Sequence, residues 1–543
     1  MEPTLIGHWR LAGDAEDASG NGHHGQNWGA DLQAPGLNGQ ANGAAAFDGR
    51  ASFIVVPHRP SLQLGTDDFS LSVNVYSEEH VDDSIGDIAA KFDSQQRNGF
   101  NFGVKRHGAA CNSLANQQNL QFGIDDGEID PAWTDCGRPG NAVFVMSLVV
   151  HEGELYAGTF ETGVDETGRV FRYAGGAEWE DLGAPDAANA VMTLASFGGQ
   201  LFAGTGRLKA LGSSLPPSSN VHEGGRVFRR EGRDWIDCGK LGGAKGDYAE
   251  YTHDTVHALE VFQGQLYGLP LYTQGLFRYD GHESWIDCGS HGSRAMTLGV
   301  FRDQLYVLEN GNGVIRFEAG ADWTRWTRVT ELPGASQVYS MAVYEGRMVV
   351  GTWPEAAVFA WEKDGSWTNM GRLGDELEVM GMAVYNGKLY AGTLPLAQVY
   401  RYDGDGRWTC TGQLDTTPEV RYRRAWSTAV FQGKLFFGTL PSGRVHSLEA
   451  GRNATCDRQL APGWRHLAAV RSGGVLRLYI DGAEVGVSTA FDPAAYDLSN
   501  QEPLQIGFGQ HDYFRGRLCD LRLYRGALSA AEIAVLGREQ TVG

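Results

Sequence analysis

The chain has 543 residues, of which 42% are hydrophobic and 20% charged, a composition that excludes a disordered protein. Its formal net charge of −21 argues against a nucleic-acid-binding surface, because phosphate contacts need clustered lysine and arginine. The 75 glycines and the scarcity of helix-like runs predict an all-β protein with many short strands and tight turns.

The first residues, MEPTLIGHW, contain neither the basic nor the apolar stretch of a secretory leader. We therefore leave two locations open: inside the cell, or outside it if a leader was removed. No apolar run reaches the length of about 18 residues that would predict a membrane-spanning helix. Residues 4–128 contain phrases typical of strands, such as AAAFDGRASFIVVP (44–57) and DFSLSVNVYS (68–77).

A two-part phrase recurs seven times between Trp133 and Thr439. Its first part is a strand, a turn and a strand, as in VMTLASFGGQLFAGT (191–205); its second is a strand followed by a tryptophan strand, as in GRVFRYAGGAEWEDLG (168–183). Four short strands per repeat predict a seven-bladed β-propeller. The apolar period near two excludes a helical solenoid. The tryptophan strands are expected at Trp133, Trp179, Trp235, Trp285, Trp323, Trp367 and Trp408.

The ends of the repeat region predict a closed ring. The strand at Trp133 precedes the first full repeat, and the last repeat stops after RVHSLEAG (443–450) without a tryptophan strand. The early strand is therefore expected to complete the seventh blade and remove an exposed sheet edge. The phrases resemble those of kelch-like and related propellers in general.

Cysteines recur with the repeat. Cys136, Cys238 and Cys288 each end a W-x-D-C-G unit, so they lie in equivalent places on separate blades, too far apart for a disulfide. We expect them to be small buried residues. A bridge among Cys111, Cys456 and Cys519, which lie outside the repeats, stays open.

The region after the propeller contains further strand patterns and one helix. LRLYIDG (476–482) alternates large and polar residues before an Asp-Gly turn, which predicts a hairpin. Ser529, followed by Glu532, predicts a helix N-cap with a capping box. Neither flank is long enough for a two-sheet sandwich, so residues 1–128 and 451–543 are expected to pair around a propeller at 129–450.

The two flanks together resemble a laminin-G-like, concanavalin-A-like jelly roll. The phrases that carry the resemblance are GWRHLAAV (463–470), LRLYIDG (476–482), LQIG (504–507) and FRGRLCDLRLY (514–524). The resemblance implies a sugar-binding or structural accessory, and such domains sometimes bind Ca²⁺ through oxygen ligands. Asp14, Asp17 and Asn21 are weak candidate ligands, with plain Asp/Asn turns as the alternative. No other cofactor is expected.

Candidate site residues are the places where blades depart from the repeat. One column of the inner strand is methionine in four blades but His257, Tyr339 and Trp426 in the other three. In the column three residues further on, Glu260 is the one charged residue. Arg294, Glu378 and Arg424 are charged where the inner strand begins, and Glu309 replaces a threonine. Long loops at 206–225, 242–254 and 414–424 lie beside the same blades, and such loops often bind ligands.

These departures predict a site on the face of the propeller that carries the loops between blades. The predicted catalytic residues, which would supply acid, base or paired carboxylates, are His257, Glu260, Tyr251, His253 and Glu309. The predicted substrate-binding residues, which would stack on sugars or pair with carboxylates, are Tyr248, Arg294, Tyr339, Trp353, Arg421, Arg424 and Trp426.

Each of these residues also has a structural interpretation. His257 can fill the methionine position between blades, Glu260 can form an ion pair in the channel, and Tyr339 and Trp426 can be packing variants. The arginines at 421–424 can form a solvated face.

The leading functional hypothesis is a carbohydrate-active monomer that binds, and as lyase or hydrolase cleaves, a polysaccharide such as a uronic acid polymer. Its partner would be a poly- or oligosaccharide, with no nucleic acid and no membrane span. One alternative is a non-enzymatic module that binds protein or glycan, because fold does not fix function. The other is a propeller enzyme acting on a small non-sugar substrate.

Overall fold

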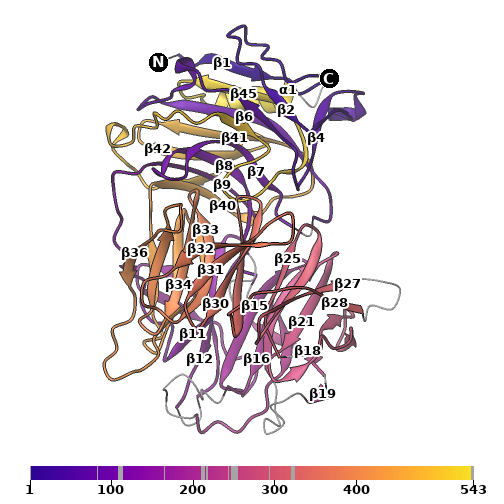
Figure 1. Cartoon of the computed structure of the whole chain (residues 1–543), viewed down its shortest axis with the longest axis vertical. Coiled ribbons are helices and arrows are strands. Elements are labelled where there is room, and N and C mark those ends of the chain that lie inside the picture. The colour runs from indigo at the N-terminus through magenta and orange to yellow at the C-terminus, as the bar shows by residue number, and fades with distance from the viewer. Residues whose placement is uncertain are drawn as a thin grey trace.

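The computed structural model describes residues 2–81, 83–107, 114–163, 166–208, 215, 218–242, 244–245, 255–292, 294–318 and 325–539. The chain is nearly all β: a seven-bladed propeller is inserted into a two-sheet jelly roll, and in Figure 1 the jelly roll lies above the propeller. In the described part of the chain, no helix is long and apolar enough to cross a membrane.

Both sheets of the jelly roll contain strands from before and after the propeller. The first sheet has the order β3 (Asp31–Ala34), β4 (Ala44–Asp48), β45 (Arg515–Arg525), β6 (Phe69–Ser77), β41 (Gly463–Ser472), β42 (Val475–Ile480) and β43 (Ala483–Val487), with β1 (Thr4–Trp9) paired to β45. The second has the order β2 (Gln26–Trp28), β5 (Phe53–Val56), β44 (Leu504–Ile506), β7 (Gly86–Asp93), β8 (Asn98–His107), β9 (Asn116–Asp126) and β40 (Arg452–Gln459). The predicted pairing of the two flanks is therefore present in the structure.

Local signals of the C-terminal flank are confirmed. Asp481 and Gly482, both with positive φ, form the two-residue loop that pairs Ile480 with Ala483 between β42 and β43. The helix α1 (Ala530–Glu539) begins after Ser529, whose backbone N–H donates to Glu532 while the Glu532 N–H donates to the serine hydroxyl. One apolar core, containing Trp9, Phe69 and Phe122, fills the space between the two sheets.

Each propeller blade has four antiparallel strands. In chain order the seven blades are β11 (Phe144–His151), β12 (Glu154–Phe160), β13 (Val170–Gly175), β14 (Glu178–Asp181); β15 (Ala190–Phe197), β16 (Gln200–Gly206), β17 (Arg226–Glu231), β18 (Asp234–Lys240); β20 (Val256–Phe262), β21 (Gln265–Pro270), β23 (Phe277–Tyr279), β24 (Trp285–Asp287); β25 (Ala295–Phe301), β26 (Gln304–Glu309), β27 (Gly313–Glu318), β28 (Arg325–Glu331); β29 (Gln337–Tyr344), β30 (Arg347–Trp353), β31 (Ala357–Trp361), β32 (Trp367–Arg372); β33 (Glu378–Tyr385), β34 (Lys388–Leu394), β35 (Gln398–Tyr402), β36 (Trp408–Gln413); and β37 (Arg424–Phe431), β38 (Lys434–Leu440), β39 (Val445–Leu448), β10 (Thr134–Asp135).

Strand pairing resolves the ring into five separate four-stranded sheets and one eight-stranded sheet. The eight-stranded sheet consists of blades one and two, which a single pair, Phe160 with Ala190, joins. The ring closes as the sequence predicts, because β10 pairs with β39 and supplies the outer strand of blade seven. Its inner strand β37 contacts β11 of blade one.

Tryptophans of the outer strands link neighbouring blades. The indole N–H of Trp179 donates to the carbonyl of Cys136 at 2.8 Å, and that of Trp285 donates to the carbonyl of Cys238 at 2.9 Å. In blade four this role belongs to Trp326, which donates to Cys288 at 3.2 Å, whereas Trp323 lies outside the described residues. The three repeat cysteines are buried and unbridged, as are Cys456 and Cys519; Cys111 lies outside the described residues.

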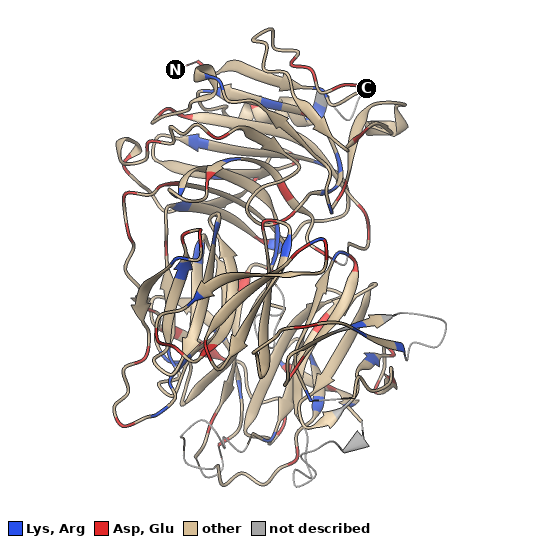
Figure 2. Cartoon of the chain, in the orientation of Figure 1, with Lys and Arg blue, Asp and Glu red and all other residues tan. Residues whose placement is uncertain are grey.

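The jelly roll covers the propeller face that carries the turns between first and second strands. The backbone N–H groups of Glu345 and Gly346 in blade five donate to the carbonyls of Gln510 and His511. Asn386 in blade six donates to the carbonyl of Ile124 at 2.9 Å. Acidic and basic residues are interspersed along both units (Figure 2). The jelly roll therefore covers this end of the propeller.

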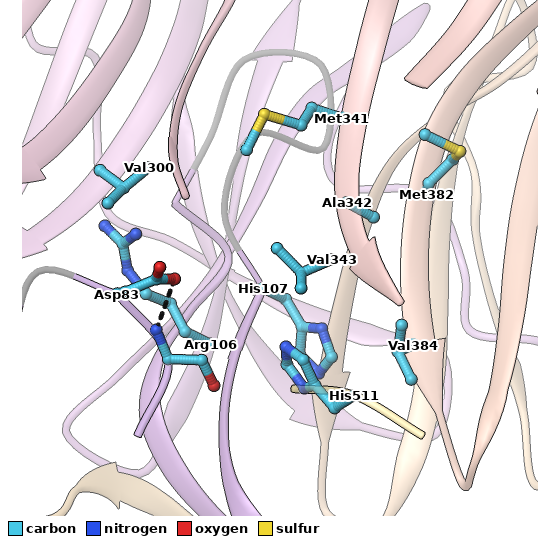
Figure 3. Close-up of a pocket in the computed structure, with 11 residues that line it drawn as sticks. Asp83, Arg106, His107, Val300, Met341, Ala342, Val343, Met382, Val384 and His511 are labelled. Atoms are coloured by element: carbon cyan, nitrogen blue, oxygen red, sulfur yellow. Dashed lines mark hydrogen bonds between the residues drawn. The ribbon is translucent and has the colours of Figure 1, made fainter. Parts of the chain in front are cut away.

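A small cavity of about 20 Å³ remains where the jelly roll meets the channel of the propeller (Figure 3). Its polar wall consists of Asp83, Arg106, His107 and His511, and its apolar wall of channel-lining residues such as Val343 and Met382. A volume of this size holds about one water molecule. The cavity is therefore an internal void at the junction and leaves no room for a substrate.

Candidate functional site

The propeller face opposite to the jelly roll carries the start of every inner strand. The residues that begin these strands, or immediately precede them, form a ring around the channel mouth: Phe144, Ala190, Thr255, Arg294, Gln337, Glu378 and Arg424. Three of them, Arg294, Glu378 and Arg424, are charged, and they belong to blades four, six and seven. We call this ring, with the side chains that pack directly beneath it, the mouth.

The floor of the mouth is apolar and aromatic. Met146, Met192, Met380 and Trp426 pack into one cluster with Phe144, and Tyr339 and Trp353 pack against it. The Trp426 ring lies 5.2 Å from that of Phe144 and 5.7 Å from that of Tyr339, both in edge-to-face geometry. The structure thus brings together three of the predicted substrate-binding residues, Tyr339, Trp353 and Trp426.

The charged part of the mouth centres on Glu378. This carboxyl is 4% exposed, and no described residue forms a hydrogen bond with its Oε1 atom. Burial raises the pKa of Glu378 to about 8, against the opposing effect of the Arg424 guanidinium on the neighbouring blade. Glu378 is not among the site residues predicted from the sequence. It occurs at the same repeat position as Arg294 and Arg424, which are among them. Its burial, which a single sequence does not reveal, is what distinguishes it.

A second carboxyl of raised pKa lies in blade one. Glu161, which follows Phe160 of the apolar cluster, is buried, and burial and Glu166 raise its pKa to about 7. Its backbone N–H donates to the carbonyl of Asn189. The repeat pattern did not predict Glu161 as a site residue. Acidic residues also occur in the neighbouring loops, so a glutamate at this position does not stand out in the sequence.

His257 has the position that the structural interpretation gives it. The side chain is buried between blades, and its Nε2 atom lies 3.0 Å from the carbonyl of Met296. Trp426 makes the equivalent contact, donating from its indole N–H to Met146 at 3.0 Å. Burial and the nearby Arg294 lower the pKa of His257 to about 3, so the imidazole is neutral at physiological pH.

Glu260 lies at the other end of the same strand, next to the jelly roll. Its Oε1 atom pairs with Nη2 of Arg106 in β8 at 2.5 Å, and both side chains are buried. It accordingly does not share a site with His257. This contact is the structural ion pair that the sequence left open as an alternative for Glu260.

Glu309, Arg294 and Arg421, which the structure describes, belong to blade four and to the loop before blade seven. Glu309 pairs with Arg328 of its own blade at 2.7 Å, and the Arg294 guanidinium lies 5.6 Å from the Tyr272 ring. Arg421 is exposed and lies over the Tyr422 ring at 4.7 Å. Tyr248, Tyr251 and His253 lie outside the described residues. Arg424 begins β37 beside Glu378.

The weak calcium candidates take part in the hydrogen bonds of turns, and the Asp14 carboxylate accepts from the backbone N–H of Glu16. Asp17 accepts from the backbone N–H groups of His8, Ser19 and His23, and Asn21 donates to the carbonyl of Ile6. Burial alone would raise the pKa of Asp17, but these hydrogen bonds lower it to about 2. Within the described ranges, no group of three or more His, Cys, Asp or Glu side chains has the arrangement of a metal site.

Comparison with known proteins supports the jelly roll. The family model of the concanavalin A-like lectin/glucanases superfamily matches residues 412–534, which include three strands of blade seven, β37 to β39, and most of the C-terminal flank. No curated protein matches the chain in sequence.

Several solved structures are similar in part to the chain. Virginiamycin B lyase from Staphylococcus aureus is 10% identical, with 59% of this chain and 99% of that chain covered and a TM-score of 0.43. YCF48 from Cyanidioschyzon merolae is 10% identical, with coverages of 59% and 98% and a TM-score of 0.40. A putative 6-phosphogluconolactonase from Bacteroides fragilis is 11% identical, with coverages of 63% and 94% and a TM-score of 0.38. These are similarities of fold alone.

Proposed function

We propose that the protein binds an acidic carbohydrate at the mouth of the propeller. The observation that carries the proposal is Glu378, a buried carboxyl without a described hydrogen-bond partner at Oε1, beside Arg424 and above an aromatic floor. Aromatic faces with a few polar groups at the rim suit sugar rings and their hydroxyls. Arg424 and Arg294 would pair with carboxylates of the ligand, since guanidinium binds carboxylate in a two-pronged fashion.

The units that we propose for this function are those predicted from the sequence. Residues 129–450 would bind the ligand, and residues 1–128 with 451–543 would support the propeller, in a monomer. The alternative is a non-enzymatic module that binds a protein at the same mouth. Titration with oligosaccharides distinguishes the two: glycan binding that depends on Arg424 favours the carbohydrate proposal, and absence of glycan binding favours the protein-binding module.

Replacing Arg424 is expected to weaken glycan binding. An Arg424→Gln variant loses a charge-assisted hydrogen bond, which corresponds to about a tenfold to hundredfold loss of affinity. Calorimetric titration with oligogalacturonate and with neutral oligosaccharides measures the effect. Arg407→Gln, at a 66% exposed arginine near the start of β36, is the matched control and should leave binding unchanged. Absence of binding to every glycan tested would reject the proposal.

Cleavage of the bound polysaccharide is a second candidate function, favoured by the raised pKa of Glu378. A carboxyl with pKa about 8 is protonated at neutral pH and able to donate a proton to a leaving group. Activity should then fall as pH rises through about 8. Glu378→Gln should lower the rate by roughly 100-fold or more while oligosaccharide binding persists. An unchanged rate in Glu378→Gln, measured as release of reducing ends or unsaturated products, contradicts this role.

A further inference from the structure

Four aromatic side chains form a row along the edge of the second jelly-roll sheet. Trp28 of β2 lies parallel to Phe53 of β5, with centroids 6.2 Å apart and planes at 8°. Phe53 lies 5.6 Å from Phe508, which stacks on Tyr513 at 4.2 Å. Trp28 is 58% exposed. Because exposed aromatic surface is costly in water, a contiguous row of this kind indicates a binding surface.

Blade five of the propeller holds one end of the row in place. Gly346, in the turn between β29 and β30, packs directly against the Tyr513 ring, and its φ of +69° is one that glycine adopts without strain. Lys363 of the same blade lies 5.6 Å from the Tyr513 centroid. Residues of both units of the chain therefore pack together at the Tyr513 end of the row.

A polar groove of about 490 Å³ adjoins the row at Phe508. Glu502 and Gln505 line it from the jelly roll, and Glu345 and Arg347 line it from blade five. Among the described residues, none forms a hydrogen bond with the Glu502 carboxylate or the Gln505 side-chain amide. The volume is in the range of about 300–1,000 Å³ that small-molecule sites occupy.

The charges of the groove select the class of ligand. Three carboxylates, those of Asp93, Glu345 and Glu502, line it together with a single arginine, Arg347. Arg347 is already paired with Glu345 at 3.3 Å and with Glu362 at 3.1 Å. An anionic ligand would meet net repulsion here, whereas hydroxyl groups would find acceptors in Glu502 and both donor and acceptor in Gln505.

We propose that this row and groove bind a neutral oligosaccharide, whose sugar rings stack on Trp28 and Phe53 and whose hydroxyls bond to Glu502 and Gln505. Flat aromatic faces next to a carboxylate and an amide fit a chain that is apolar on its ring faces and polar at its edges. The surface lies at the jelly-roll end of blade five, the end opposite to Trp353 and the mouth. It therefore goes beyond the function proposed for the mouth and is independent of it.

Titration calorimetry on the full-length chain with cellohexaose, mannohexaose and a galacturonate hexamer tests this inference. At least one neutral hexamer should bind, and Trp28→Ala should weaken that binding about tenfold, while Trp28→Phe retains most of it. Glu502→Gln should weaken it severalfold. Val487→Ala, at a 45% exposed apolar residue on β43, is the control and should bind like the wild type. The thermal midpoint of Trp28→Ala should be unchanged, because its side chain is mostly exposed.

The outcomes separate this surface from the mouth. Neutral binding that is equal in Trp28→Ala and wild type, or that is lost in Arg424→Gln only, would overturn the inference. So would the absence of binding to both neutral hexamers, or Trp28-dependent binding of the galacturonate hexamer alone. Loss of acidic binding in Arg424→Gln, with neutral binding intact, would support the mouth and this surface separately.

Discussion

An Arg106→Met variant is expected to lose about 3–5 kcal/mol of unfolding free energy, the usual result of removing one partner from a buried ion pair. Arg106 pairs with Glu260 at 2.5 Å, with side chains 5% and 1% exposed, and also donates to the carbonyl of Val261. Methionine would remove the guanidinium that pairs with the buried Glu260 carboxylate. Arg106 also lowers the pKa of nearby Asp83, so its removal would destabilise the charged form of that carboxyl as well. The midpoint of urea unfolding, followed by tryptophan fluorescence, measures the loss.

Two further variants test whether the loss of stability comes from leaving one charge of a buried ion pair in place. Arg477→Met removes an exposed pair with Glu484, 2.7 Å long with side chains 36% and 40% exposed, and should cost at most about 1 kcal/mol. Arg106→Met combined with Glu260→Leu removes both charges and should recover most of the stability. Equal effects of Arg106→Met and Arg477→Met would show that the junction does not depend on this pair.

Replacing His107 is expected to make the protein more tolerant of acid. His107 is fully buried and stacks on His511 at 5.4 Å; burial, together with Lys105, lowers its pKa to about 3. The unfolded chain therefore binds a proton below pH 6.5 that the folded chain does not. Stability linked to His107 is complete above pH 6.5 and is lost as pH falls toward 3, by about 1.4 kcal/mol per pH unit.

In a His107→Gln variant, unfolding free energy should depend less steeply on pH between 6.5 and 4.5. Between pH 6.5 and pH 4.5, the wild type should lose about 3 kcal/mol more unfolding free energy than the variant. Urea unfolding at each pH measures both values. Distant titrating groups act alike in both proteins, whereas the pKa of His511, which His107 helps to lower, would rise in the variant and change the slope in the same direction. Val535→Ala, at a 45% exposed residue of α1 that does not titrate, is the control, and its curve should run parallel to that of the wild type. Parallel curves for His107→Gln as well would contradict the assignment.

Most of the fold could be predicted because its signals are local. The repeat phrases, the Asp481-Gly482 turn and the Ser529–Glu532 capping box each act over a few residues. Ring closure by β10 followed from counting strands at the two ends of the repeat. Blade four is the exception: Trp326, three residues after the predicted Trp323, makes the link to the preceding blade.

The candidate site was less predictable because its chemistry depends on distant contacts. Arg106 lies 154 residues from Glu260 and belongs to the jelly roll. Comparing the propeller repeats with one another therefore cannot predict this ion pair. Comparing equivalent positions of the blades does predict Tyr339 and Trp426 of the aromatic floor, because both replace the methionine that most blades have at that position. It cannot distinguish a buried carboxyl such as Glu378 from an exposed one, since burial depends on what packs above each residue.

The insertion of the propeller between the two halves of the jelly roll sets an order of assembly during synthesis. Strand β9 ends at Asp126, and its partner β40 begins at Arg452, about 330 residues later. At roughly 5–20 residues per second, the N-terminal half waits on the order of 15–65 s for its partners. During that time the apolar faces of β6 to β9 lack their cover, and β10 lacks β39. Residues 445–525, which contain β39 and the C-terminal strands of the jelly roll, therefore complete both the ring and the jelly roll, and a chain truncated before them would expose both unfinished edges to aggregation.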